Sequence, residues 1–140
     1  MLAKIKEILI IVKKRQLSQY KNILFDGKRL GIKINYIEQK TPLGLPDAFI
    51  LGEKFIGKDN TALILGDNFF YGQSLTKKLK DCIRMNSGCR ILVHPVSKPE
   101  LYGVANINTN GKVISIKEKP KKSKSNLAIT GLYFFDNKVV

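Results

Sequence analysis

The sequence predicts an α/β fold: a largely parallel sheet with helices on both faces, followed by a β-hairpin insertion. Two observations indicate this class. Branched aliphatic runs alternate with segments of helical apolar spacing across short connections, and an Asn-Gly pair lies between two late strand-like runs. A chain of 140 residues has the length of one ordinary domain, and neither a repeat nor a linker divides it.

The first half of the chain alternates strand and helix patterns. Residues 7–13 form the dense aliphatic run of a strand buried on both faces, and residues 17–25 follow with apolar side chains at helical spacing. Residues 32–36 alternate as a second strand. A loop containing Gly44 then leads into a helix predicted at about 46–55.

The middle of the chain adds two strands and one helix. Residues 61–65 are a third buried strand. Ser74 is suited to cap the N-terminus of a helix that ends by Gly88, and residues 91–96 form a fourth strand.

The last part of the chain predicts a hairpin and a final strand. Residues 104–107 and 113–119 flank a turn that contains Asn110 and Gly111, and an Asn-Gly pair is typical of hairpin turns. Residues 126–135 form the last strand. In open α/β sheets ligands bind beyond the carboxyl ends of strands, so the loops after those ends are where we expect a site.

Composition excludes several classes of protein. The chain is 44% hydrophobic and 26% charged, which is globular, and no apolar run is long enough for a membrane span or a secretory signal. Its 25 Lys and Arg against 11 Asp and Glu give a net charge of +14, mostly from lysine, which predicts a solvated surface more than a nucleic-acid site. Cys82, Cys89 and the single His94 match neither a disulfide framework nor a zinc site, so we expect reduced thiols in a cytoplasmic protein.

The sharpest chemical signal is the segment Leu65-Gly66-Asp67-Asn68. Here a carboxylate leaves a buried strand directly after a glycine, where it could share a divalent cation with a phosphate. Magnesium prefers such oxygen ligands. The alternative is that Asp67 only caps a turn or a helix.

Several motifs occur in order along nearly the whole chain. They are YIEQ to GLPDAF at 36–49, LGDNFFYG at 65–72, YGV at 102–104, EKP at 118–120 and TGLYFFDN at 130–137. Any one alone would be weak, but together and at this spacing they resemble the glucose-1-phosphate thymidylyltransferases, a family of sugar nucleotidyltransferases.

The resemblance implies a Rossmann-like nucleotidyltransferase fold and a reaction. The reaction is nucleotidyl transfer from dTTP to α-D-glucose 1-phosphate with Mg²⁺, giving dTDP-glucose and pyrophosphate for dTDP-rhamnose, other deoxysugars or polysaccharides. It also implies a cytoplasmic enzyme that is a homo-oligomer at full length, with no nucleic-acid or membrane partner.

The resemblance also shows a gap. The family's glycine-rich loop, of the type GGxGTRLxPxT, and its second metal-binding aspartate have no counterpart in residues 1–140. We therefore expect residues 1–140 to be an interior fragment, truncated at both ends. Such a fragment should be inactive alone, and the missing central strand should leave sheet edges unpaired and the chain prone to associate.

Functional residues carry over where this sequence matches the family. Gln39 and Gly44 are implied to bind the base, where a glutamine offers a donor and an acceptor to the imide edge of thymine or uracil. Asp67 is implied to bind the nucleotide through the metal ion. Pro46 and Asp47 depart from the alanine and glutamine common in the family, which leaves base contacts there open.

The sugar side is implied to involve a larger set, with Tyr133 packing beneath it. Lys119 would bind the sugar phosphate and Glu118 the glucose hydroxyls, so Asp67 and Lys119 are the expected catalytic residues. His94 and the two cysteines have no role in the family. The implied sugar-binding residues are Asn68, Tyr102, Gly103, Glu118, Lys119, Thr130 and Gly131.

Two other functions stay open. A UTP-dependent sugar-1-phosphate nucleotidyltransferase would share most of these motifs. A non-catalytic basic module that binds nucleic acid would need aromatic side chains among the lysines on one face, whereas here the aromatics fall in strands or family motifs.

Overall fold

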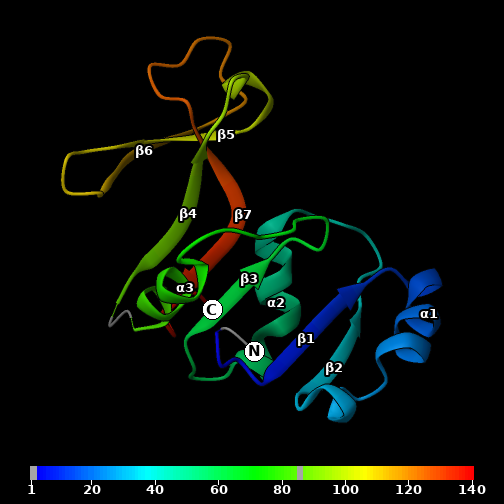
Figure 1. Cartoon of the computed structure of the whole chain (residues 1–140). Helices are drawn as coiled ribbons and strands as arrows, with labels where there is room; N and C mark the ends of the chain where they lie inside the picture. The colour runs from blue at the N-terminus through cyan, green and yellow to red at the C-terminus, as the bar shows by residue number, and fades with distance from the viewer. Residues whose placement is uncertain (1–2, 85–86) are drawn as a thin grey trace.

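Two separate β-sheets form the framework of the chain. The computed structural model describes residues 3–84 and 87–140 (Figure 1). The elements are β1 (Glu7–Val12), α1 (Lys14–Leu24), η1 (Lys28–Leu30), β2 (Lys33–Glu38), α2 (Leu45–Ile56), β3 (Thr61–Ile64), α3 (Leu75–Ile83), β4 (Cys89–Pro95), η2 (Pro99–Leu101), β5 (Gly103–Ile107), β6 (Val113–Glu118) and β7 (Leu127–Phe135).

The first sheet is a parallel pair of β1 and β2. Its register runs from Glu7 opposite Lys33 to Val12 opposite Glu38, and α1 makes the crossover between the strands. The branched side chains of Val12, Ile32 and Ile34 are buried. This part of the chain confirms the predicted strand–helix–strand unit.

The second sheet has five strands, and all of its pairings are antiparallel. Its order is β3-β7-β5-β6, with β4 also pairing with β7. The long strand β7 is therefore the hub, and Val104, Ala105, Ala128, Leu132 and Phe134 are buried around it. The β5–β6 hairpin confirms the predicted insertion and projects from the body of the molecule (Figure 1).

Helices α2 and α3 lie on opposite faces of β7. On one face, the ring of Phe49 from α2 meets Phe135 edge to face at 5.0 Å. On the other, Leu132 and Phe134 pack with Leu79 and other residues of α3. Neighbouring residues of a strand point to opposite faces, so the pattern confirms the expected helices on both faces for this sheet.

The expectation of one largely parallel sheet is wrong. In residues 3–84 and 87–140, parallel pairing is confined to β1 and β2, and β3 pairs with β7 and not with β1. The arrows of β1 and β3 nevertheless point the same way (Figure 1). The alternating pattern thus predicted the direction of these strands correctly, whereas their partners are decided by segments far away in the sequence.

Backbone hydrogen bonds show which residues of β1 face its open edge. The amides of Lys33 and Gln39 donate to the carbonyls of Lys6 and Val12, at 2.7 and 2.8 Å. In a parallel pair alternate residues bond to the same neighbour, so odd-numbered residues such as Leu9 aim their backbone groups the other way. Within the described residues no strand pairs with that edge.

The edge of β3 that faces β1 is likewise unpaired within the described residues. The amide of Leu65 donates to the carbonyl of Gly131 at 3.0 Å, so odd-numbered residues bond to β7 and Ala62 and Ile64 face away from it. A groove of about 1010 Å³ lies between β1 and β3, lined by apolar side chains of both strands and of α2. Residues 8–11 are accordingly only half-buried, which corrects the expectation of a strand buried on both faces.

We expect the 140-residue chain to self-associate through these open edges. Unpaired strand edges beside an apolar groove are templates for pairing with another chain. Sedimentation velocity over a concentration series should show dimers or larger species, and Ile64→Lys should shift them toward monomer. Ile64 is 54% exposed and lies on the open edge of β3.

Ile23→Lys is the matched control. Ile23 is 74% exposed, but it lies on helix α1, away from the groove and from the strand edges. A chain that stays monomeric at every concentration, or an equal effect of the two lysines, would contradict this account.

One other predicted detail needs correction. Ser74 does precede α3, but it has φ 61° and its side chain makes no capping hydrogen bond. Helix α3 ends at Ile83, before Gly88, as predicted.

Candidate functional site

The predicted base-binding residues lie where β2 ends and α2 begins. The side-chain nitrogen Nε2 of Gln39 donates to Oδ2 of Asp47 at 2.6 Å, and both side chains are half-buried. Gly44 precedes α2 with φ 97°, in the region that favours glycine. Pro46 and Asp47 occupy the first turn of α2, as predicted, and the carboxylate of Asp47 suits the positive end of the helix.

Asp67 lies in an exposed turn that follows β3. The amide of Asn68 donates to the carbonyl of Leu65 at 3.2 Å, which closes the turn around Asp67. Among the described residues, the Asp67 carboxylate makes no hydrogen bond or ion pair. Asp67 therefore does not cap this turn, and its oxygens are available to a ligand.

This turn packs against β7 at Gly131. Gly131 has φ 73°, and a side-chain carbon there would lie against Asn68 and only 2.9 Å from Cδ1 of Leu65. Any larger residue at 131 would thus push the turn outward. Gly131 is therefore a positioning residue for Asp67 and Asn68.

The predicted sugar-side residues meet at the ends of β5 and β6. Gly103 lies opposite Glu118 in the ladder, and a side-chain carbon on Gly103 would be 3.0 Å from Oε2 of Glu118. The amide of Lys119 donates to the carbonyl of Tyr102 at 3.0 Å. β6 ends at Glu118, and Lys119 has φ 41°. The side chains of Glu118 and Lys119 therefore need not point to opposite faces, as neighbours on a continuing strand do.

Glu118 also acts on Tyr133 of β7. Burial raises the pKa of the Tyr133 hydroxyl, and the negative charge of Glu118 adds to this rise. The ring stacks on Phe135 at 6.2 Å between centroids. The Asp67 turn packs on β7 at Gly131, whereas Glu118 lies on β6, two strands along in the same sheet.

Thr130 is placed differently from its neighbours. Its hydroxyl donates to the carbonyl of Leu92 at 2.9 Å, which ties β7 to β4 across an irregular part of the ladder. The side-chain oxygen of Thr130 is thus already bonded within the sheet. Gly131, the next residue, is the one that touches the Asp67 turn.

Cys82, Cys89 and His94 lie outside these clusters. Both thiols are free, and burial raises the pKa of Cys82 and of Cys89. Cys82 packs with Leu132 and Phe134. The packing of Cys82 agrees with a structural role, whereas Cys89 and His94 are exposed on β4.

The residues fit Mg²⁺ in one limited mode. Within the described residues, no cluster of three or more His, Cys, Asp or Glu side chains could hold a metal ion. Mg²⁺ is commonly bound by one or two carboxylates together with substrate phosphates and water. A single unbonded carboxylate at Asp67 suits this mode, in which the nucleotide completes the coordination.

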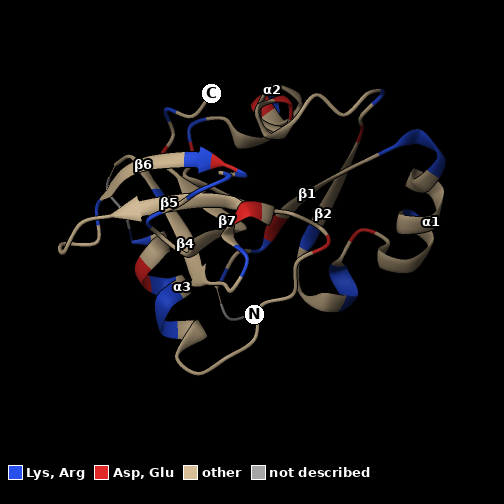
Figure 2. Ribbon diagram, turned by 90° about the horizontal axis from the view of Figure 1, so that it is seen from above, with Lys and Arg blue, Asp and Glu red and all other residues tan. Residues whose placement is uncertain are grey.

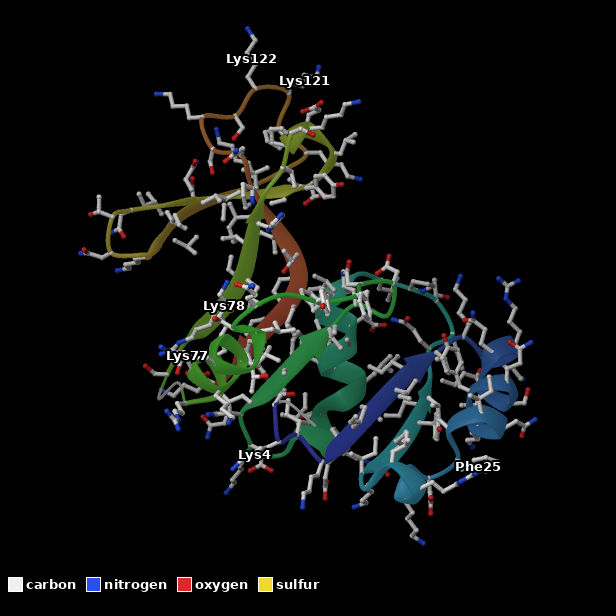
Figure 3. The ribbon with its side chains drawn as sticks, viewed as in Figure 1. Lys4, Phe25, Lys77, Lys78, Lys121 and Lys122 are labelled. Atoms are coloured by element: carbon white, nitrogen blue, oxygen red, sulfur yellow. The ribbon has the colours of Figure 1, made fainter. Side chains whose placement is uncertain are left out.

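The basic residues do not form one binding face. Lys and Arg are spread over α1, α3 and β6 (Figure 2). Lys77 and Lys78 lie on α3, whereas Lys121 and Lys122 extend from the loop after β6, at another end of the molecule (Figure 3). In the described part of the chain, no helix is both long and apolar enough to cross a membrane.

Sequence reasoning missed two features of this region. It treated Asp47 only as a helix-forming departure from the family, although the structure joins it to Gln39. It also assigned nothing to Phe69 and Tyr71, which are 88% and 92% exposed beside Asp67. The signal available in the sequence was the aromatic run Phe69-Phe70-Tyr71 directly after Asp67 and Asn68.

The chain is similar to known proteins over its whole length. The family model for nucleotidyl transferases matches residues 1–140. The chain is 47% identical to a glucose-1-phosphate thymidylyltransferase of Neisseria meningitidis over all 140 residues, which are 49% of that protein. It is 41% identical to one from Mycobacterium tuberculosis, again over the whole chain and 48% of the relative. The chain thus spans about half the length of these relatives.

Solved structures show the same fold. A Bacillus anthracis protein assigned as a glucose-1-phosphate thymidylyltransferase superimposes with a TM-score of 0.85 at 36% identity, over 94% of this chain and 52% of that one. A UDP-glucose pyrophosphorylase bound to UDP-glucose gives 0.73 at 25% identity, over 97% and 60%. With its whole length matched by the family model and by these relatives, the chain belongs to the nucleotidyl transferase family.

Proposed function

We propose that residues 1–140 are the base-reading and sugar-binding part of a glucose-1-phosphate thymidylyltransferase. One observation supports this most directly: the Asp67 turn packs on Gly131 of β7, and Gly103, Glu118 and Lys119 meet at the ends of β5 and β6, where β5 is the neighbour of β7. Residues suited to a nucleotide-bound metal ion and to a sugar phosphate thus lie on neighbouring strands of one sheet. The identity of 47% to a thymidylyltransferase over the whole chain supports the same assignment.

The reaction would be an in-line displacement at the α-phosphorus of dTTP. A phosphate oxygen of glucose 1-phosphate forms the new P–O bond, the bond between the α-phosphorus and the bridging oxygen breaks, and pyrophosphate leaves with that electron pair. The nucleophile is already an anion, so no general base is needed. Positioning and charge neutralisation supply the catalysis.

Each cluster has a role in this scheme. Gln39 and Gly44 would bind the base, Tyr102, Gly103 and Glu118 the hexose, and Lys119 the phosphate of glucose 1-phosphate. Asn68, Thr130 and Gly131 would border the sugar; since the Thr130 side chain is bonded to Leu92, it would contribute mainly its place in β7. Asp67 would hold Mg²⁺, whose charge offsets that of the phosphates when it is bound.

The biological setting follows from the proposed product. dTDP-glucose would be a precursor of dTDP-rhamnose, other deoxysugars or polysaccharides, and we place the enzyme in the cytoplasm as a homo-oligomer. The glycine-rich triphosphate loop of the family has no counterpart in residues 1–140. The chain by itself is therefore expected to bind parts of the substrates without turning them over.

A chimaera tests this function. Residues 1–140 would replace the 140 matching residues of the N. meningitidis relative, which supplies the rest of the enzyme. We expect the chimaera to release pyrophosphate from dTTP and glucose 1-phosphate, and the isolated chain to release none above background. A folded but inactive chimaera, or one that prefers UTP, would contradict the proposed function, and rapid turnover by the isolated chain would contradict its partial character.

A further inference from the structure

The contact between Gln39 and Asp47 joins two elements at the proposed base site. Gln39 directly follows β2, and its backbone amide donates to the carbonyl of Val12 at 2.8 Å, which fixes where its side chain starts. Asp47 lies in the first turn of α2. Nε2 of Gln39 reaches Oδ2 of Asp47 at 2.6 Å, a short and partly buried hydrogen bond.

The chemistry of the two side chains determines which end of the amide faces Asp47. An ionised carboxylate has only acceptors, whereas a glutamine amide has a donor end and an acceptor end. Turning the amide over would bring Oε1 of Gln39 against Oδ2 of Asp47, with no proton between the two oxygens. Gln39 is thus held with its nitrogen toward Asp47 and its oxygen toward the other side.

We propose that Asp47 is a positioning residue that fixes the Gln39 amide in the orientation that selects an imide base; this rests on the proposed function. Held this way, Gln39 offers Oε1 as an acceptor and its second Nε2–H as a donor. Thymine and uracil present the complement, a ring N–H beside a carbonyl oxygen. Cytosine presents a ring nitrogen acceptor beside an amino donor, so it would require the amide orientation that Asp47 opposes.

The inference predicts that changing Asp47 weakens the preference for dTTP over dCTP. Asp47→Asn keeps the size of the side chain, but its amide can either donate or accept, so Gln39 becomes free to turn over. In the chimaera, the ratio of kcat/KM for dTTP to that for dCTP should fall at least tenfold, mainly through better use of dCTP. Glu53→Gln is the matched control, because it removes an exposed carboxylate from the same helix and should leave the ratio unchanged.

A second measurement uses the 140-residue chain without nucleotide. NMR of the Gln39 side-chain amide should show one slowly exchanging Nε2 proton, and Asp47→Ala should speed its exchange at least fivefold. An unchanged exchange rate in Asp47→Ala would overturn the inference whatever the kinetics show.

The two proposals fail in different ways. Unchanged dTTP-to-dCTP discrimination in an active Asp47→Asn chimaera would overturn the inference and leave the proposed function in place. A folded parent chimaera that uses neither nucleotide would overturn the proposed function, and with it the role of Asp47 in base selection.

Discussion

Asp67→Asn is expected to lower the kcat of the chimaera by at least about a hundredfold. The substitution removes the charge that would hold the metal ion, and charge neutralisation is the main catalytic contribution in this reaction. The fold should be unaffected, because Asp67 is exposed and its carboxylate makes no hydrogen bond or ion pair with another described residue. Steady-state assays of pyrophosphate release, with unfolding curves of both proteins, measure the two effects separately.

A matched variant separates this effect from a general loss of negative charge. Asp59→Asn removes a carboxylate from an exposed position between α2 and β3, close in sequence to Asp67 but outside its turn. It should leave kcat within twofold. If the kcat of Asp67→Asn stays within tenfold of the parent value, Asp67 is not a metal ligand and serves only in the turn.

Lys119→Ala is expected to raise the KM for glucose 1-phosphate roughly 10- to 150-fold. The estimate follows from a charge-assisted phosphate contact of about 1.5–3 kcal/mol. Lys119 lies just past the end of β6 with φ 41°, where the chain is free of strand alternation. The KM for dTTP should change little, because the proposed base site lies between the end of β2 and the start of α2.

Glu118→Gln should have a separable effect. It removes a strong hydroxyl acceptor but keeps the size of the side chain, so it should chiefly weaken discrimination among hexose 1-phosphate epimers. Lys121→Ala is the control for charge, since Lys121 extends from the loop after β6 (Figure 3). If Lys119→Ala leaves the kinetics with glucose 1-phosphate unchanged, Lys119 does not bind the phosphate and is a solvent-exposed charge like Lys121.

Much of the local structure could be predicted from the sequence. Each predicted strand and helix is present, usually within a few residues of its expected ends, and the turn at Asn110 and Gly111 closes the predicted hairpin. Pro46 and Asp47 begin α2 as expected. These features follow from backbone preferences and apolar periodicity, which act over a few residues.

The candidate site was predicted only in part. The motifs named Gly103, Glu118 and Lys119, and the structure brings these together at the ends of β5 and β6. The bond between Gln39 and Asp47 was not anticipated, because it joins residues eight apart whose side chains meet only when β2 and α2 pack together.

By itself, the sequence determined the elements, the hairpin and the family resemblance, and it named the candidate functional residues. Only the tertiary structure decided that β3 pairs with β7, that β1 and β3 leave a groove between their open edges, and that the Asp67 turn packs against Gly131 of β7. The physical reason is the separation along the sequence over which each interaction acts. Turn chemistry and periodicity are set by near neighbours, whereas strand pairing depends on which distant segments together bury their apolar faces and satisfy their backbone hydrogen bonds.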